Sequence, residues 1–274
     1  MASPQIPLVD FSAIKLRQQS VWSTGDYTLI GTTLVIISEQ LCEAVDVHAG
    51  ERVLDVATGS GITALAAARR FGEVTGIDYV PALVEDAKQR AAAEHLSVNF
   101  QVGDAENLPF ADASFDVVLS TLGVMFAPHQ EKTASELLRV CRAGGKIGLA
   151  NWTPTGFIGE LFRLIGKYVP PPAGLKPGSL WGTEERLRDL LGDGIASLQA
   201  TKRQFVFRYR SASHWLDHFG AYYGPMIATL RALDATRREE FSREVISLLE
   251  SYNRAQDGTL VAPSEYLEAV AVKR

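Results

Sequence analysis

Residues 53–61 read VLDVATGSG, an apolar strand pattern that runs directly into a glycine-rich turn. The residues that follow, ITALAAARR at 62–70, favour a helix because alanine and leucine have high helix propensity. Glycines let the main chain approach a ligand closely, and the first turn of a helix offers free N–H groups. This order of strand, turn and helix predicts a ligand site at the carboxyl end of the strand.

The turn alone leaves several interpretations open. Residues 59–64, GSGITA, also satisfy the dinucleotide-binding spacing, and a purely structural turn would look similar. Asp55, just before the turn, suits a ligand with a positive amino group better than a pyrophosphate, which it would repel. Asp78 closes the next predicted strand, where a carboxylate can accept both ribose hydroxyls. A dehydrogenase would use the same residue, so Asp78 indicates a ribose rather than a reaction.

A third acidic segment, GDAENLPF at 103–110, follows the third predicted strand. Asp104 can accept a hydrogen bond from an adenine amine while the Ala105 N–H donates to the ring. An acidic turn is the plainer interpretation of this stretch. Its place at a third strand end is nevertheless where the adenine of such a ligand should lie.

Strand and helix patterns alternate with short loops from residue 51 to residue 150. Repeated β-α units of this length predict a parallel sheet with right-handed crossovers. Two later strands complete a doubly wound, mostly parallel seven-stranded α/β sheet. The predicted strands cover 52–56, 73–77, 97–102, 115–120, 146–150, 197–210 and 266–272, and the helices of the core cover 62–70, 81–93 and 131–142.

The remaining segments decorate this sheet. We expect an N-terminal helical lid at 1–45 that includes a helix at 32–45, a core at 46–150, a loop and helix insertion with the sixth strand at 151–210, an inserted helical cap at 211–258, and a closing strand at 259–274. Three segments should fold together over the carboxyl ends of the strands, with Trp22 and Tyr27 closing on the ligand. These segments are 1–45, 151–182 and 211–258. The cap should contribute His214, Tyr222 and Tyr223, although 211–258 could instead form a dimer interface.

These segments together resemble the class I S-adenosylmethionine-dependent methyltransferases, in the branch similar to quinone-biosynthesis and other small-molecule methyltransferases. Residues 137–146, LLRVCRAGGK, resemble the turn of arginine, proline and two glycines before the fifth strand of that family, with Ala143 in place of the proline. Ala57 stands where the family often has its first glycine. Residues 120–123 read STLG, so the Asn/Asp-Pro-Pro-aromatic motif of DNA and protein-amide methyltransferases is absent there.

The resemblance implies S-adenosylmethionine as cofactor and S-adenosylhomocysteine as product. It places one group of residues around the methionine part, a second at the ribose, a third at the adenine and a fourth under the sulfonium. In that order these groups are Asp55, Ala57, Gly59 and Gly61; Asp78 and Tyr79; Asp104, Ala105 and Glu106; and Ser120 and Leu122. Tyr27 is expected to close over the cofactor.

Composition narrows the setting. The net charge of −5 gives no electrostatic attraction to a phosphate backbone, so we expect no nucleic-acid partner. Cys42 and Cys141 lie in apolar helical patterns, which favours buried free thiols and a reducing cytoplasm. No apolar run reaches the ~18 residues of a membrane span, and residues 1–15 lack a signal-peptide pattern. A homodimer is compatible with the chain.

We expect methyl transfer to an oxygen, carbon or nitrogen of a small, partly apolar metabolite, because the added segments are rich in aromatic residues. His214 is the candidate general base, since imidazole titrates near neutral pH. His214 and His218 are four residues apart, but no further ligand accompanies them, so we expect no metal. The alternatives are a nucleotide-dependent oxidoreductase and a non-catalytic cofactor-binding module.

Overall fold

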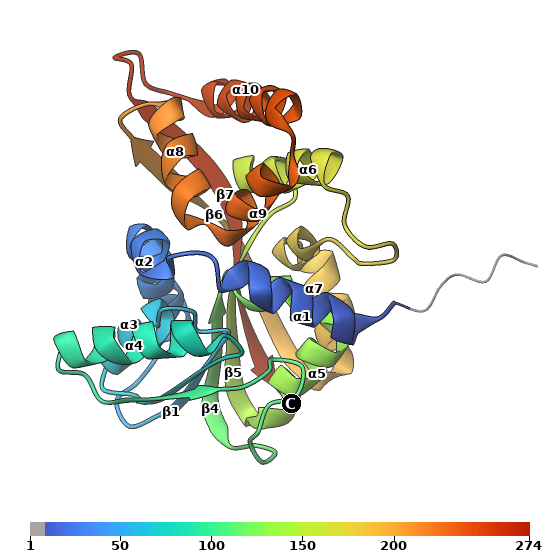
Figure 1. Cartoon of the computed structure of the whole chain (residues 1–274). Coiled ribbons are helices and arrows are strands. Elements are labelled where there is room, and N and C mark those ends of the chain that lie inside the picture. The colour runs from blue at the N-terminus through green and yellow to red at the C-terminus, as the bar shows by residue number, and fades with distance from the viewer. Residues whose placement is uncertain (1–8) are drawn as a thin grey trace, which may run out of the picture.

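A seven-stranded sheet runs through the centre of the molecule, with strand order β3-β2-β1-β4-β5-β7-β6 (Figure 1). The computed structural model describes residues 9–274, so the first eight residues of the predicted lid lie outside it. Neighbours from β3 to β5 are parallel, whereas β7 is antiparallel to both β5 and β6. The predicted mostly parallel, doubly wound sheet is therefore confirmed. The strands are β1 (Arg52–Val56), β2 (Glu73–Asp78), β3 (Val98–Val102), β4 (Phe115–Thr121), β5 (Cys141–Trp152), β6 (Ile195–Tyr209) and β7 (Leu260–Lys273).

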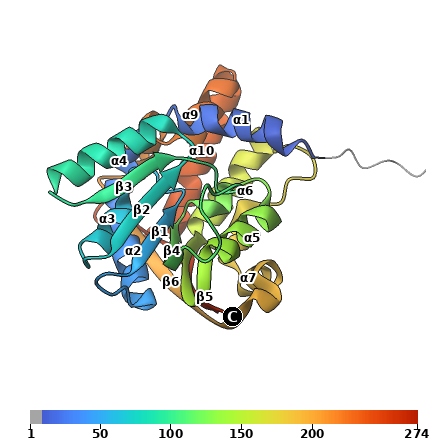
Figure 2. The same cartoon turned by 90° about the horizontal axis from the view of Figure 1, so that it is seen from below.

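Helices cover both faces of the sheet and the carboxyl ends of its parallel strands. Helices α2, α3 and α4 pack on one face and α5 and α7 on the other (Figure 2). Helices α6, α8, α9 and α10 gather beyond the carboxyl ends of the parallel strands, and α1 lies between them and the sheet (Figure 1). The helices are α1 (Phe11–Trp22), α2 (Tyr27–Val45), α3 (Ile62–Ala68), α4 (Pro81–Ala93), η1 (Val124–Phe126), α5 (Gln130–Val140), α6 (Phe157–Tyr168), η2 (Gly178–Gly182), α7 (Glu184–Leu191), η3 (Gly192–Gly194), α8 (Ala212–Tyr222), α9 (Gly224–Ala232) and α10 (Ala235–Tyr252).

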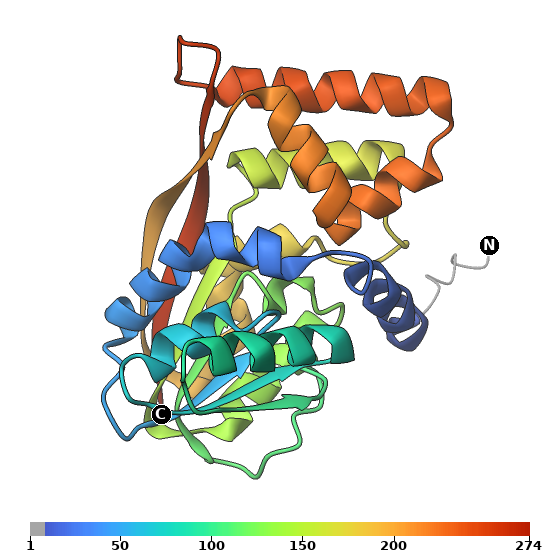
Figure 3. The ribbon, with the colours of Figure 1, turned by 60° about the vertical axis from the view of Figure 1, so that its left-hand side comes forward.

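Strands β6 and β7 extend beyond the carboxyl ends of the parallel strands, and helices α8, α9 and α10 connect them (Figure 3). Strand β7 pairs with β5 only as far as Tyr266, but with β6 as far as Leu260. The closing strand is therefore longer than the predicted 266–272. Pro263 interrupts the sequence pattern, yet it lies where β7 has a strand on one side only, and a proline without an N–H is tolerated there.

Helix α2, which lies within the segment predicted as an N-terminal lid, packs in the protein core. It begins at Tyr27, earlier than the predicted residue 32, because the Asp26 carboxylate caps it by accepting from two main-chain N–H groups. By length and composition α2 could cross a membrane. Its face with Ile37, Leu41 and Cys42 is nevertheless fully buried in the protein core. Cys42 is one of two buried free thiols, as predicted.

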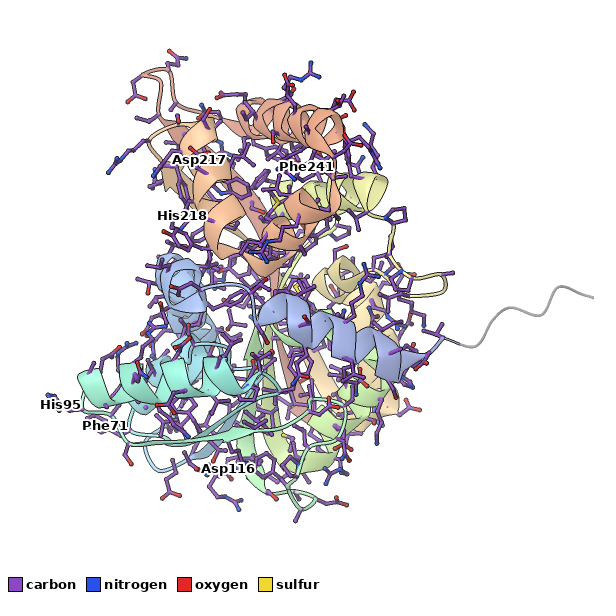
Figure 4. All side chains as sticks on the ribbon, viewed as in Figure 1. Phe71, His95, Asp116, Asp217, His218 and Phe241 are labelled. Atoms are coloured by element: carbon purple, nitrogen blue, oxygen red, sulfur yellow. The ribbon has the colours of Figure 1, made fainter. Side chains whose placement is uncertain are left out.

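The turn at Gly144-Gly145 differs from its prediction. The helix ends at Val140, and β5 begins at once with Cys141 instead of at residue 146. The pairing with β4 is irregular here, and a Cβ on Gly145 would lie 2.7 Å from the Asp116 carbonyl oxygen. The glycine therefore permits a close approach of two strands. Asp116 forms ion pairs with Arg142 and Arg52, which join the amino ends of β4, β5 and β1. Asp116 therefore lies at the end of the sheet away from α8 (Figure 4).

Candidate functional site

A cavity of about 180 Å³ opens at the carboxyl ends of the parallel strands, between the sheet and the helices beyond it. Open α/β sheets bind ligands at this edge. Most of the residues predicted to bind a cofactor line the cavity, whereas Asp55, Gly61 and Ser120 lie behind its wall. The lining residues from the prediction are Tyr27, Ala57, Gly59, Asp78, Tyr79, Asp104, Ala105, Glu106 and Leu122.

The loop after β1 has an unusual backbone. Ala57, Gly59 and Gly61 all have positive φ angles of 55°, 54° and 85°. For the non-glycine residue Ala57 this conformation costs about 1–2 kcal/mol, so the surrounding structure must hold it. No atom lies within 4 Å of the position where a Cβ on Gly59 would stand. The main chain is therefore bare on that side and accessible to a ligand in the cavity.

Asp55 joins the strand, the turn and the following helix. One carboxylate oxygen, Oδ2, accepts hydrogen bonds from Thr58 Oγ1 at 2.5 Å and from the Ala64 N–H at 2.9 Å. The other oxygen, Oδ1, is buried and has no partner among the described residues. Burial raises the pKa of Asp55 to about 7. A buried carboxylate with a spare acceptor suits a positively charged or hydrogen-bond-donating ligand group nearby.

Asp78 lies at the end of β2 and contacts the loop after β1. Its Oδ2 accepts from the Gly59 N–H at 2.9 Å, and its Oδ1 accepts from the Val80 N–H at 3.0 Å. Each oxygen keeps further acceptor capacity toward the cavity. Burial raises the pKa of Asp78 to about 6, and burial also raises the pKa of Tyr79 beside it. This geometry is suitable for a pair of ligand hydroxyls.

The acidic segment after β3 is covered by α1. Lys15 Nζ lies 2.6 Å from Asp104 Oδ2 and 2.7 Å from Glu106 Oε2. Burial lowers the pKa of Lys15, but its hydrogen bonds to the two carboxylates outweigh that effect and raise it. Gln19, which also lies on α1, donates a hydrogen bond from its side chain to the Tyr79 carbonyl oxygen. The predicted adenine region therefore has a basic residue from α1 above it.

Leu122 forms part of the cavity floor, and Ser120 lies beneath it, between β1 and β4. The buried Ser120 hydroxyl donates to the Val56 carbonyl oxygen at 2.7 Å and accepts from the Val124 N–H at 3.1 Å. Leu122 lines the cavity and has a positive φ of 57°, like Ala57 across from it. Ser120 thus positions the two loops without reaching the cavity itself.

Segments from both ends of the chain meet above this floor. The rings of Trp22 and Tyr27 lie 6.1 and 6.3 Å from that of Tyr223, which follows α8. The Asp26 N–H donates to the Tyr222 carbonyl oxygen, and the Gly224 N–H donates to the Tyr27 hydroxyl at 3.2 Å. The link between α1 and α2 is therefore fastened to the junction of α8 and α9.

The part of the cavity away from the acidic residues is largely apolar. It lies between α2, the end of β5, α6, β6 and α8. Side chains from these elements pack on one another; for example, Trp152 and Phe207 rings lie 6.0 Å apart. The apolar lining residues are Ile30, Leu34, Phe126, Trp152, Ile158, Phe207 and Phe219.

His214 does not line the cavity. It lies in the first turn of α8, where its Nδ1 accepts from the Arg210 N–H at 3.4 Å. A general base must reach the proton that it removes, so this position does not support that hypothesis. Its neighbour His218 lies on α8 beside Asp217 (Figure 4). Across residues 9–274 no group of three or more His, Cys, Asp and Glu side chains is arranged to hold a metal ion.

Some lining residues carried no recognisable signal in the sequence. Lys15 and Phe126 belong to no motif, and their place depends on how α1 and η1 fold over the sheet. Thr121 ends β4, and its buried hydroxyl has no partner among the described residues. The rule that ligands bind at strand ends would find Thr121, which lies between Ser120 and Leu122, the two residues that the family resemblance indicates.

Comparison with known proteins adds a second line of evidence. Residues 54–149 match a family model described as a methyltransferase domain. An uncharacterised protein of Mycobacterium tuberculosis is 37% identical over 273 residues, which cover 98% of each chain. A demethylmenaquinone methyltransferase of Deinococcus radiodurans is 39% identical over 131 residues, which cover 46% of this chain and 54% of that protein.

Among solved structures, the YcgJ protein of a Bacillus species is similar in fold. Its TM-score is 0.62 at 23% sequence identity, over 86% of this chain and 98% of that one. The match therefore includes most of the sheet and its covering helices, and at this level of identity it concerns the fold alone.

Proposed function

This chain belongs to the class I S-adenosylmethionine-dependent methyltransferases, and we propose that it methylates an oxygen, carbon or nitrogen of a small, partly apolar metabolite. The observation that carries the proposal is the division of the cavity. Asp78, Asp104 and Glu106 stand at one end, and a chamber of apolar side chains forms the other. A polar cofactor and an apolar acceptor would each find a matching half.

The residues at the polar end fit S-adenosylmethionine. The bare main chain at Gly59 suits the methionine part, with Asp55 holding the turn from behind the cavity wall, and Asp78 suits the ribose hydroxyls. Asp104 and the Ala105 main chain suit the adenine, with Lys15 balancing the acidic charge. When bound, the cofactor supplies an activated methyl group on a sulfonium, so the protein has to supply alignment and shelter.

The apolar end fits an acceptor without a metal or a strong base. Tyr27 and Tyr223 offer hydroxyl groups there, and none of the described cavity-lining residues is a histidine. Aligning two reactants and excluding water supply much of the catalysis in such a transfer. The relative from Deinococcus acts in name on demethylmenaquinone, and a quinone-like or phenolic ring would suit this chamber in size and polarity.

Helix α1 would serve as the lid over the cofactor. It presents Lys15, Gln19 and Trp22 to the cavity side, yet has no buried residue of its own. Such a helix is held by a few polar and aromatic contacts and can open at low cost. We include in the proposal a cytoplasmic location, a small-molecule partner rather than a nucleic acid, and the possibility of a homodimer.

Calorimetry with the full chain tests the proposal. S-adenosylhomocysteine should bind and NADH should not, because a dinucleotide would bring its pyrophosphate near Asp55. Protein incubated with methyl-labelled S-adenosylmethionine and a lipid extract should then transfer label to a small molecule. Binding of NADH alone would favour the oxidoreductase alternative, and cofactor binding without any transfer would favour a non-catalytic module.

A further inference from the structure

Building on the proposed function, we propose that the Tyr223 hydroxyl orients the acceptor and selects an uncharged, apolar molecule that carries a hydrogen-bond-accepting atom such as a carbonyl oxygen. Tyr223 would then be a specificity-determining residue that the cap contributes. The proposal rests on how its ring is held, on its unpaired hydroxyl and on the charges around it.

The ring of Tyr223 is fixed from several directions. Its main chain ends α8 and begins α9, with its N–H donating to the Phe219 carbonyl oxygen at 2.9 Å. Its ring packs edge-on against those of Trp22, Tyr27 and Phe219, at centroid distances of 6.1, 6.3 and 5.6 Å. Because these partners come from α1, α2 and α8, the hydroxyl has a defined position in the cavity wall.

The hydroxyl of Tyr223 has nothing to bind within the described protein. The side chain lines the cavity and only 8% of the residue is exposed, yet no described residue hydrogen-bonds to its hydroxyl. By contrast, the Tyr27 hydroxyl accepts from the Gly224 N–H. The hydroxyl oxygen of Tyr223 is not itself buried, because it faces the open space of the cavity. A phenol that has no protein partner and faces a cavity offers a hydrogen bond to a ligand atom there.

The surroundings decide the charge of that ligand. The charged residues that line the cavity are Lys15, Asp78, Asp104 and Glu106, and they come from α1 and the strand ends rather than from the chamber near Tyr223. Two of these carboxylates are already paired with Lys15. A charged acceptor in the apolar half would lose its hydration without gaining a counter-charge from the protein. The chamber therefore disfavours carboxylates and ammonium groups.

The protonation state decides the direction of the hydrogen bond. Burial raises the pKa of Tyr223, and burial likewise raises the pKa of Tyr27 beside it. Both phenols therefore keep their protons at neutral pH and cannot remove one from the acceptor. Tyr223 therefore has a proton to donate, and we propose that a hydrogen-bond-accepting atom of the ligand receives it.

Three naphthalene probes with the protein saturated by S-adenosylhomocysteine test this inference. They are 2-acetylnaphthalene, which has a neutral carbonyl, naphthalene, which has no polar atom, and 2-naphthoate, which is charged. The wild-type protein should bind the ketone about tenfold more tightly than naphthalene, and 2-naphthoate more weakly than the ketone. In Tyr223→Phe the preference for the ketone should disappear while naphthalene binds as before, because only the hydroxyl is lost.

Matched measurements separate the possible failures. Tyr222→Phe changes the neighbouring, partly exposed tyrosine that does not line the cavity, and it should keep the ketone preference. Calorimetry with S-adenosylhomocysteine checks folding and the cofactor half of every variant. If the wild-type protein fails to bind S-adenosylhomocysteine, the proposed function itself is wrong. If S-adenosylhomocysteine binds, three outcomes would overturn the Tyr223 inference alone. These are no binding of any naphthalene probe, equal affinity for 2-naphthoate and the ketone, and an unchanged preference for the ketone over naphthalene in Tyr223→Phe.

Discussion

A Cβ atom on Gly123 would lie 2.6 Å from the carbonyl oxygen of Ala57, so the loops that follow β1 and β4 touch beside the cavity. Both loops carry a strained non-glycine residue next to this contact, Ala57 with φ 55° and Leu122 with φ 57°. The φ of Gly123 itself is −101°, an ordinary value for any residue. The contact rather than the backbone conformation therefore requires glycine at position 123.

Replacing Gly123 by alanine should displace the loop that carries Ala57 and Gly59. Overpacking of this kind costs about 1–3 kcal/mol, and a shift of the Gly59 main chain should weaken S-adenosylhomocysteine binding about tenfold or more. Calorimetry and thermal unfolding measure the two effects. Gly166→Ala, in the interior of α6 with only an ordinary contact at 3.8 Å, should leave binding unchanged. Equal affinity of Gly123→Ala and the wild type would refute the prediction.

Asp78 should be the principal ribose ligand. Its two oxygens are held by the N–H groups of Gly59 and Val80, and it lines the cavity. Asp78→Ala should weaken S-adenosylhomocysteine binding by roughly 1.5–3 kcal/mol, the range for hydrogen bonds to a charged group. The 2′,3′-dideoxy analogue of S-adenosylhomocysteine, which lacks both ribose hydroxyls, should bind the wild type and the variant with similar affinity. A full loss of that second ligand's binding in the variant would show that the loop had collapsed instead.

The sequence predicted the sheet well because the strands depend on local patterns. Apolar runs between turns located β1 to β4 to within about a residue, and Asp78 and Asp104 follow strands whose ends meet at one edge. Strand β5 begins earlier than the sequence predicts, because Gly144-Gly145 resembles a helix stop. There the glycines allow β5 to approach Asp116.

The part of the cavity that depends on long-range packing could not be predicted in the same way. Lys15 pairs with Asp104 across 89 positions of the chain, and Tyr27 contacts Gly224 across 197. No periodicity in the sequence specifies which residues of α1 and α8 face the sheet. Only the chemistry of imidazole favours His214 as a base, and the first turn of α8 holds it away from the cavity wall.

Asp55→Asn should make the stability of the unliganded protein less dependent on pH. Burial raises the pKa of Asp55 to about 7, whereas an aspartate in an unfolded chain titrates near 4. The folded state therefore binds this proton more tightly, and stability falls as the pH rises from about 4 to about 7. Asparagine carries no charge at any pH, so the variant should gain in melting temperature relative to the wild type between about pH 5 and about pH 8.

Asp116→Asn provides the matched control for this pH series. Burial acts to raise the pKa of Asp116, but hydrogen bonds from Arg142 and Arg52 outweigh it and lower this pKa to about 2. That carboxylate stays ionised from about pH 5 to about pH 8, so its replacement should change the melting temperature by an amount independent of pH. A difference between Asp55→Asn and the wild type that also stays constant would mean that Asp55 titrates outside this interval.

Lys15 joins helix α1 to the acidic segment at the cofactor end of the cavity. The Lys15 side chain is 23% exposed, and its partners Asp104 and Glu106 are 33% and 7% exposed. Ion pairs that remain partly open to water contribute up to about 1 kcal/mol and weaken with salt. Trp22 and Gln19 add contacts from the same helix, but none of the residues of α1 is buried.

Lys15→Met keeps the alkyl chain and removes the charge, so α1 should open more readily while its packing is retained. S-adenosylhomocysteine should then dissociate about fivefold faster in stopped-flow measurements, which corresponds to roughly 1 kcal/mol. Raising the salt concentration should accelerate dissociation from the wild type but have little effect on the variant. Lys88→Met, which removes an exposed pair of 3.9 Å with Glu85 on α4, should behave like the wild type. Slower dissociation from Lys15→Met would show that Lys15 competes with the adenine for Asp104 instead of holding the lid closed.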